Sequence, residues 1–172
     1  MGESFPSCKT ETRPSNISFE VLELIHGAKS GKSSTAKRGF AMEVLIHNDQ
    51  QLEKWREGVM TRMRMSALLG GRQLCIFDQF CDPGLGAPLH IHAVEEVLEV
   101  IEGTAEIWLG KKSAIVKPNQ SVLVPAGAKH GFRNLENTTL HVRATLAAPI
   151  FEASYGDSTE LSRRWTPDHF DL

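Results

Sequence analysis

Two histidines and two adjacent glutamates lie within seven positions of the stretch LHIHAVEEV, Leu89 to Val97, in a chain of 172 residues with seven histidines. Imidazole and carboxylate groups bind transition metals and also exchange protons, so metal binding or acid–base catalysis is the chemistry that this stretch could perform. A histidine pair alone also arises by chance in a chain of this composition. Whether this pair belongs to a functional site must therefore be judged from the surrounding residues.

The alternation of side chains along an extended strand separates these residues into two faces. His90, His92 and Glu96 share one face, whereas Glu95 lies on the other. Leu98 continues the first face with an apolar group, which indicates that this face points inward. A carboxylate buried among apolar neighbours must be paired or coordinated. We therefore expect two imidazoles and one carboxylate to converge inside the fold.

A fourth candidate ligand is His130, in the stretch PAGAKHGFRN. Pro125 and Gly127 predict a turn after the strand SVLV, and this turn would bring His130 onto the next strand. Neutral imidazoles and a carboxylate on a rigid sheet suit a borderline divalent ion. The expected cofactor is one divalent transition metal, and Fe(II), Mn(II), Ni(II) and Zn(II) all remain open.

The elements that would hold these residues are mostly strands. From residue 41 onward, short alternating or apolar segments are separated by turn residues, a pattern typical of a sandwich, jelly roll or barrel. The predicted strands are MEVLIH, VMTRMRMSAL, RQLCIFDQFC, EVLEVI, TAEIWL, AIV, SVLV and LHVRATLAA. Only DQQLEKWRE (49–57) and LSRRW (161–165) are predicted as short helices.

The spacing of these motifs resembles that of the cupin family. The first cupin motif is G, five residues, HxH, three or four residues, E, six residues, G, and it is met by Gly84, His90, His92, Glu96 and Gly103. The second is G, five residues, PxG, two residues, H, three residues, N, and it is met by Pro125, Gly127, His130 and Asn134. Its leading glycine is replaced by Asn119, which tolerates the left-handed backbone that such a turn requires.

The resemblance implies an all-β double-stranded β-helix, a barrel of jelly-roll type, with an N-terminal arm and short helical pieces. We expect residues 1–40 to form the arm and a flexible loop, including an extra or swapped strand, 41–150 to form the barrel, and 151–172 to form a tail. It also implies that the metal ligands are His90, His92, Glu96 and His130.

Fold alone does not choose the reaction, because similar cupins catalyse several kinds. The leading hypothesis is a metal-dependent enzyme that acts on a small organic molecule, as a dioxygenase-type oxidoreductase. The alternatives are a non-catalytic cupin that binds or senses a metal or small ligand, and a cupin isomerase, lyase or decarboxylase. Glu96 is the candidate catalytic residue, since it could stay a ligand or leave the metal to act as a base.

Composition restricts the partners. The formal net charge is −2 and the Lys and Arg residues are scattered, which argues against a nucleic-acid partner. No stretch has the apolar length of a signal peptide or membrane span, so we expect a cytoplasmic protein without a membrane partner.

The three cysteines are expected to be small apolar packing residues in a reducing compartment. Resembling barrels dimerise, so a homodimer is expected, with FEVLELIH (19–26) as the strand to exchange.

One competing motif is rejected. The stretch HGAKSGKS resembles a phosphate-binding P-loop, but His26 occupies the position of its first glycine. The residues that follow contain Gly39 and then predict a strand, where the motif needs a helix. We therefore expect a flexible loop there.

Overall fold

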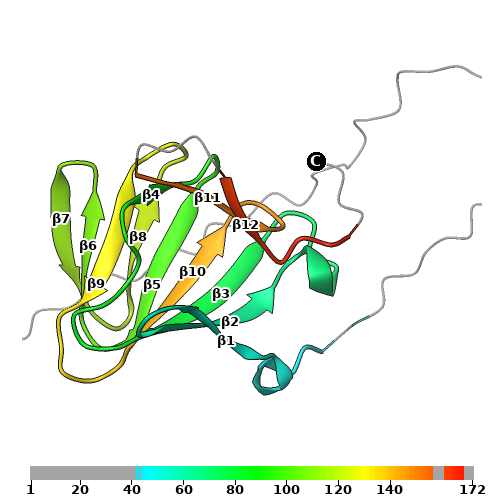
Figure 1. The fold of residues 1–172 in the computed structure, drawn as a ribbon, viewed down its shortest axis with the longest axis horizontal. Helices are drawn as coiled ribbons and strands as arrows, with labels where there is room; N and C mark the ends of the chain where they lie inside the picture. The colour runs from blue at the N-terminus through cyan, green and yellow to red at the C-terminus, as the bar shows by residue number, and fades with distance from the viewer. Residues whose placement is uncertain (1–41, 43, 157–160, 169–172) are drawn as a thin grey trace, which may run out of the picture. The chain divides into compact units, whose positions relative to one another are not determined.

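A computed structural model describes residues 42, 44–156 and 161–168 of the chain. Two antiparallel sheets of six strands each make up these residues (Figure 1). The first sheet has the order β1 (Leu52–Arg56), β2 (Val59–Met65), β3 (Cys75–Cys81), β10 (Leu140–Leu146), β5 (Glu96–Glu102), β8 (Gln120–Val124). The second has the order β12 (Leu161–Arg164), β11 (Phe151–Tyr155), β4 (His90–Ile91), β9 (His130–Asn134), β6 (Ala105–Leu109), β7 (Lys112–Val116). Two short 3₁₀ helices, His47–Asp49 and Ala67–Leu69, complete the described elements.

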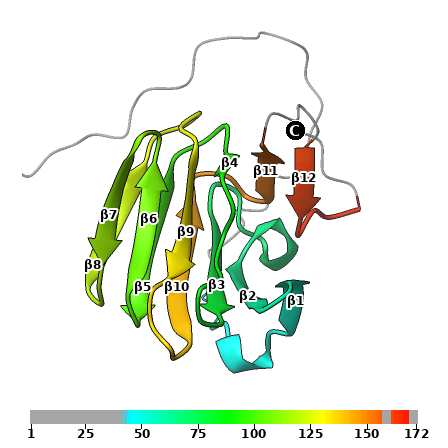
Figure 2. The same cartoon turned by 60° about the vertical axis from the view of Figure 1, so that its left-hand side comes forward.

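The two sheets face each other and enclose the core (Figure 2). Strand β10 pairs with both β3 and β5, and β9 pairs with both β4 and β6, so strands distant in sequence alternate across each sheet. On every central strand, alternate side chains point inward, as the buried positions of β10 at Leu140, Val142, Ala144 and Leu146 illustrate. The predicted double-stranded β-helix is confirmed.

The turns behave as the motif residues predict. Asn119, which replaces the leading glycine of the second motif, has φ of 64°, in the left-handed region. Gly127, two residues after Pro125, has φ of 75° and its amide donates a hydrogen bond to the carbonyl of His92. This bond connects the turn before β9 directly to the histidine pair, so the second motif is anchored on the first.

Both predicted helices are wrong. DQQLEKWRE contains the end of the first 3₁₀ helix and then strand β1, which forms a hairpin with β2. Gly58, with φ of 64°, makes the tight turn between them, and the pairing with β2 outweighs the helical preference of the charged residues. LSRRW contains strand β12, which pairs with β11. The predicted strand MEVLIH is not seen in its described residues: 42 and 44–46 are irregular, and His47 begins the 3₁₀ helix.

The sheets continue past residue 150, where the predicted tail begins. Strands β11 and β12 both lie in 151–164, and β11 extends the second sheet beside β4. The predicted arm, the P-loop-like stretch and the strand proposed for exchange lie outside the described residues. Among the residues that are described, no helix has the length and apolar character needed to cross a membrane. Cys75 and Cys81 are free and buried in the core, as predicted for apolar fillers.

Candidate metal centre

Four side chains converge at one end of the barrel, and they are the four that the motifs predict. His90 lies in β4, His92 follows that strand directly, Glu96 opens β5, and His130 opens β9. The pairing of β4 with β9 sets His90 opposite His130. All four side chains are buried, and each offers one ligand atom such that these atoms lie within 4.8 Å of one another. Glu95 is exposed, as the strand alternation predicts.

Backbone carbonyls fix the orientation of each imidazole. Nδ1 of His90 lies 2.7 Å from the carbonyl oxygen of Pro88, and Nδ1 of His130 lies 2.8 Å from that of Ala128. In His92 it lies 2.5 Å from the carbonyl of Glu152. A carbonyl oxygen only accepts, so each Nδ1 must carry the proton and donate. In the neutral rings the lone pair is therefore on Nε2, as in metal-binding histidines whose other nitrogen donates to the protein.

The Nε2 atoms point at one another and at the Glu96 carboxylate. The Nε2 atoms of His90 and His92 are 3.1 Å apart, and Nε2 of His130 is 2.7 Å from Oε2 of Glu96. Among the described residues, neither of the last two atoms makes a hydrogen bond of acceptable geometry. Lone pairs that face each other in a buried site repel unless a cation lies between them. The donor set therefore fits a divalent ion, and three nitrogens with one oxygen suit a borderline transition metal.

Burial and the close approach of the four side chains shift their pKa values. Burial lowers the pKa of His90 to about 4, and burial also lowers the pKa of His92. Burial alone would lower the pKa of His130, but the adjacent Glu96 carboxylate outweighs burial and the pKa is raised. Burial would raise the pKa of Glu96, but the imidazoles around it, with His130 first, hold the pKa below its usual value. A bound metal requires neutral imidazoles and a carboxylate. The shifts at His90, His92 and Glu96 favour these states, whereas an ion would have to displace the proton that Glu96 favours on His130.

We expect a transition metal to stabilise the fold. At a free ion concentration of about 1,000 times the Kd, binding to the native state alone adds about 4.1 kcal/mol to the free energy of unfolding. For a chain of this size that raises Tm by about 8–16 °C. Differential scanning fluorimetry of chelator-treated protein with added Zn²⁺, Mn²⁺, Ni²⁺ or anaerobic Fe²⁺ measures the shift. Mg²⁺, which prefers oxygen ligands, is the control. Equal Tm values with and without every transition ion would contradict a metal centre.

Aromatic side chains line one flank of the centre. The ring of Phe151 lies 5.4 Å from that of His92, and the ring of Tyr155 lies 5.7 Å from that of His90. Trp55, from the first sheet, contacts both Phe151 and Tyr155. Burial raises the pKa of Tyr155 to about 12, so its hydroxyl is a neutral donor. The flank combines flat apolar surface with one phenolic hydroxyl.

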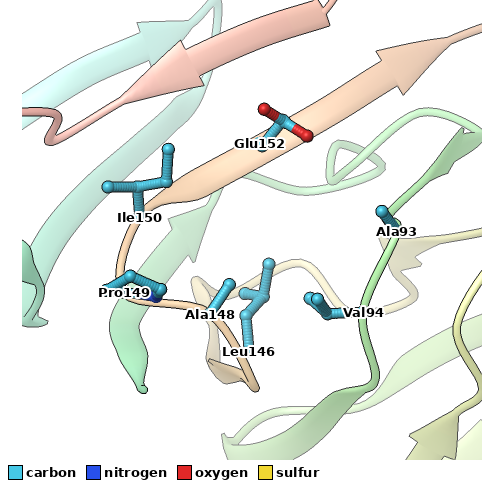
Figure 3. Close-up of a pocket in the computed structure, with 7 residues that line it drawn as sticks. All are labelled: Ala93, Val94, Leu146, Ala148, Pro149, Ile150 and Glu152. Carbon is cyan, nitrogen blue, oxygen red and sulfur yellow. The ribbon is translucent and has the colours of Figure 1, made fainter. Parts of the chain in front are cut away.

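A small apolar pocket lies between the two residues that follow His92 and the 146–152 segment. It has a volume of about 140 Å³ and is bounded by Ala93 and Val94 on one side and by the 146–152 segment on the other (Figure 3). Glu152, in this segment, also supplies the carbonyl that orients His92. The pocket therefore borders the segment that orients His92.

Other residues of the motifs have structural roles. The amide of Asn134, which shares the strand parity of His130, donates to the carbonyls of Cys81 and Thr138. It joins the end of β3 to the loop that follows β9. Phe132 is buried in the core, as expected for a packing residue. Sequence reasoning missed Phe151 and Tyr155, although the alternation in FEASY could have predicted a strand with both residues on one face.

Comparison with known proteins agrees with this architecture. A family model described as a cupin domain matches residues 79–146, which include all four converging residues. No curated protein matches the chain significantly. The fold and the two motifs agree with this cupin-domain match, which spans 68 of the 172 residues.

Several solved structures share the fold at low sequence identity. KdgF from Halomonas sp. is 17% identical with a TM-score of 0.55, and the match covers 62% of this chain and 94% of that one. The polyketide cyclase RemF from Streptomyces resistomycificus is 17% identical with a TM-score of 0.57, over 74% of this chain and 89% of that one. Oxalate decarboxylase from Bacillus subtilis is 16% identical with a TM-score of 0.58, over 63% of this chain and 30% of that one. At this identity the likeness shows the fold alone.

Proposed function

We propose that this chain is a metal-dependent enzyme that acts on a small organic molecule, and that its reaction is of the dioxygenase type. The observation that carries the proposal is the convergence of three oriented imidazole Nε2 atoms and one carboxylate in a buried site. An Fe(II) ion held by four such ligands would keep two coordination positions for substrate and dioxygen. The substrates that suit this arrangement are enols, diketones and hydroxy-carbonyl compounds.

The residues have distinct roles in this proposal. His90, His92 and His130 would hold the ion through Nε2, since their Nδ1 atoms are engaged by carbonyls. Glu96 would be either a fourth ligand or a base that accepts a substrate proton at Oε2. Its Oε2 atom lies 2.7 Å from Nε2 of His130 and faces the converging nitrogens, which is compatible with both roles.

Oxygen consumption tests the proposal directly. Metal-free protein is loaded anaerobically with Fe(II), and its metal content is measured before a panel of enols, diketones and hydroxy-carbonyl compounds is added with dioxygen. We expect oxygen uptake above that of Fe(II) in buffer for at least one compound, because the site brings substrate and dioxygen together. The Zn(II)-loaded protein is the control, since zinc has no redox chemistry. Iron-loaded protein without oxygen uptake across the panel would contradict a dioxygenase.

The alternatives give different results in the same assay. Anaerobic release of carbon dioxide from oxalate would favour a decarboxylase, the activity named for one of the structural neighbours. Isomerised or cleaved product without oxygen uptake would favour an isomerase or lyase. Bound metal and bound ligand without any product would favour a binding or sensing module.

A further inference from the structure

Strand β11 places a tyrosine beside the proposed metal ligands. Its inward positions are Phe151 and Ala153, both buried, and Tyr155 continues this face. The register of β11 and β4 makes Tyr155 the direct cross-strand partner of His90. The two rings lie 5.7 Å apart and are inclined by 32°. The phenol is thus held against a side chain that would bind the ion.

The hydroxyl of Tyr155 does not contribute a hydrogen bond to the described part of the fold. It is buried, yet it has no hydrogen-bond partner among the described residues. Buried tyrosine hydroxyls usually find a partner, because an unsatisfied donor costs free energy. A phenylalanine would fill the same space without this cost. An unpartnered donor beside a candidate centre is explained if its acceptor arrives with a ligand.

The side chains around this hydroxyl indicate what kind of ligand fits. The ring of Trp55 lies 6.4 Å from the Tyr155 ring, so the flank is flat and aromatic. The charges of Arg56 and Arg164 both act on Tyr155. Arg164 is paired with Glu53 at 2.6 Å, whereas the guanidinium of Arg56 lies over the face of Trp55, 5.1 Å from the ring centroid. Among the described residues Arg56 makes no ion pair, so its positive charge lies beside the aromatic flank.

We propose that the Tyr155 hydroxyl donates a hydrogen bond to an anionic oxygen of the ligand bound at the metal centre, and that this ligand is a flat, partly apolar enolate, phenolate or carboxylate. The inference rests on the proposed function, because it takes the four converging residues as the metal site. The aromatic flank would hold the flat part of the ligand, and the positive charge of Arg56 would favour its negative oxygen.

A binding titration separates this role from a structural one. The probe is 4-nitrocatechol, a flat phenolate ligand whose absorption spectrum changes on binding, and the protein is loaded with Zn(II) so that no turnover occurs. For Tyr155→Phe we expect the Kd of the probe to rise about tenfold to a hundredfold, as for a lost hydrogen bond to a charged acceptor. The Kd for Zn(II) and the circular dichroism spectrum should not change, because the ring is retained.

Two controls test whether the effect is specific to the Tyr155 hydroxyl and to an anionic ligand oxygen. Ser154→Ala removes a hydroxyl from the neighbouring position of the same strand, on the opposite face, and should leave the Kd of the probe unchanged. Imidazole, a neutral ligand without oxygen, should bind wild type and Tyr155→Phe equally. If zinc-loaded Tyr155→Phe bound 4-nitrocatechol as tightly as wild type, the inference would be overturned while the proposed function would stand. Loss of zinc from this variant also overturns the inference, since Tyr155 would then support the centre itself. Wild-type protein that binds no metal overturns both the inference and the proposed function.

Discussion

The His130→Ala protein should bind its divalent metal at least ~100-fold more weakly than the wild type. Loss of a group that only orients a metal ligand typically weakens binding by about 10–100-fold, so loss of a ligand should exceed this. His130 is fully buried, and its Nε2 atom lies 2.7 Å from Oε2 of Glu96. Its removal takes away one nitrogen donor and leaves the Glu96 carboxylate without its nearest imidazole. Competition against a chromophoric chelator at fixed pH measures the affinity.

The matched control for this variant is His47→Ala. His47 is a described histidine in the first 3₁₀ helix, outside the converging group. Its loss should leave the metal affinity within about twofold of wild type, because it contributes no ligand atom. If His130→Ala retained wild-type affinity while remaining folded, any bound ion would have to lie elsewhere in the chain. The proposed function would then lose the observation that carries it.

The convergence of the four residues could be predicted because its causes are local. Strand alternation alone assigns His90, His92 and Glu96 to the inside and Glu95 to the outside. The turn at Pro125 and Gly127 is also encoded locally, and the left-handed backbone of Asn119 follows from its residue type. In these cases the direction of the side chain and the backbone conformation depend only on residues a few positions away. The sequence therefore contains enough information for this part of the site.

The surroundings of the site depend on contacts between distant segments. The carbonyl that orients His92 belongs to Glu152, sixty residues later, and Tyr155 meets His90 only through the register of β11. Neither pairing has a local signal, because any strand with a suitable apolar face could occupy that edge of the sheet. The same reason explains the wrong helix at 49–57. Its charged residues suit a helix locally, whereas pairing with β2 decides the outcome.

The second large effect that we expect is a loss of stability when the buried carboxylate of Asp78 is removed. Asp78 lies on the outer face of β3 with no exposed side-chain surface, covered by three basic side chains. It accepts hydrogen bonds from Arg64 and Arg143, and Nε2 of His141 lies 3.0 Å away. Asp78→Ala should lower the free energy of unfolding by about 3–5 kcal/mol, because it leaves two guanidinium groups without their shared partner. Urea denaturation at pH 7 measures this loss.

The pH dependence of this effect has a definite sign. Burial alone would raise the pKa of Asp78, but the hydrogen bonds from its basic neighbours outweigh burial and hold the pKa well below its usual value. A lowered folded-state pKa stabilises the protein above the unfolded-state value of about 3.9, and this contribution is lost as the pH falls below it. The difference between wild type and Asp78→Ala should therefore narrow between pH 6 and pH 3.

Glu106→Gln is the control for this second variant. Glu106 pairs with Arg133 on the second sheet, and the Arg133 side chain is 53% exposed. An exposed pair contributes about 0–1 kcal/mol, so this substitution should change the unfolding free energy little at any pH. Equal losses in the two variants would mean that burial does not strengthen the Asp78 cluster. A loss in Asp78→Ala that stayed constant down to pH 3 would show that the carboxylate contributes through packing and not through its charge.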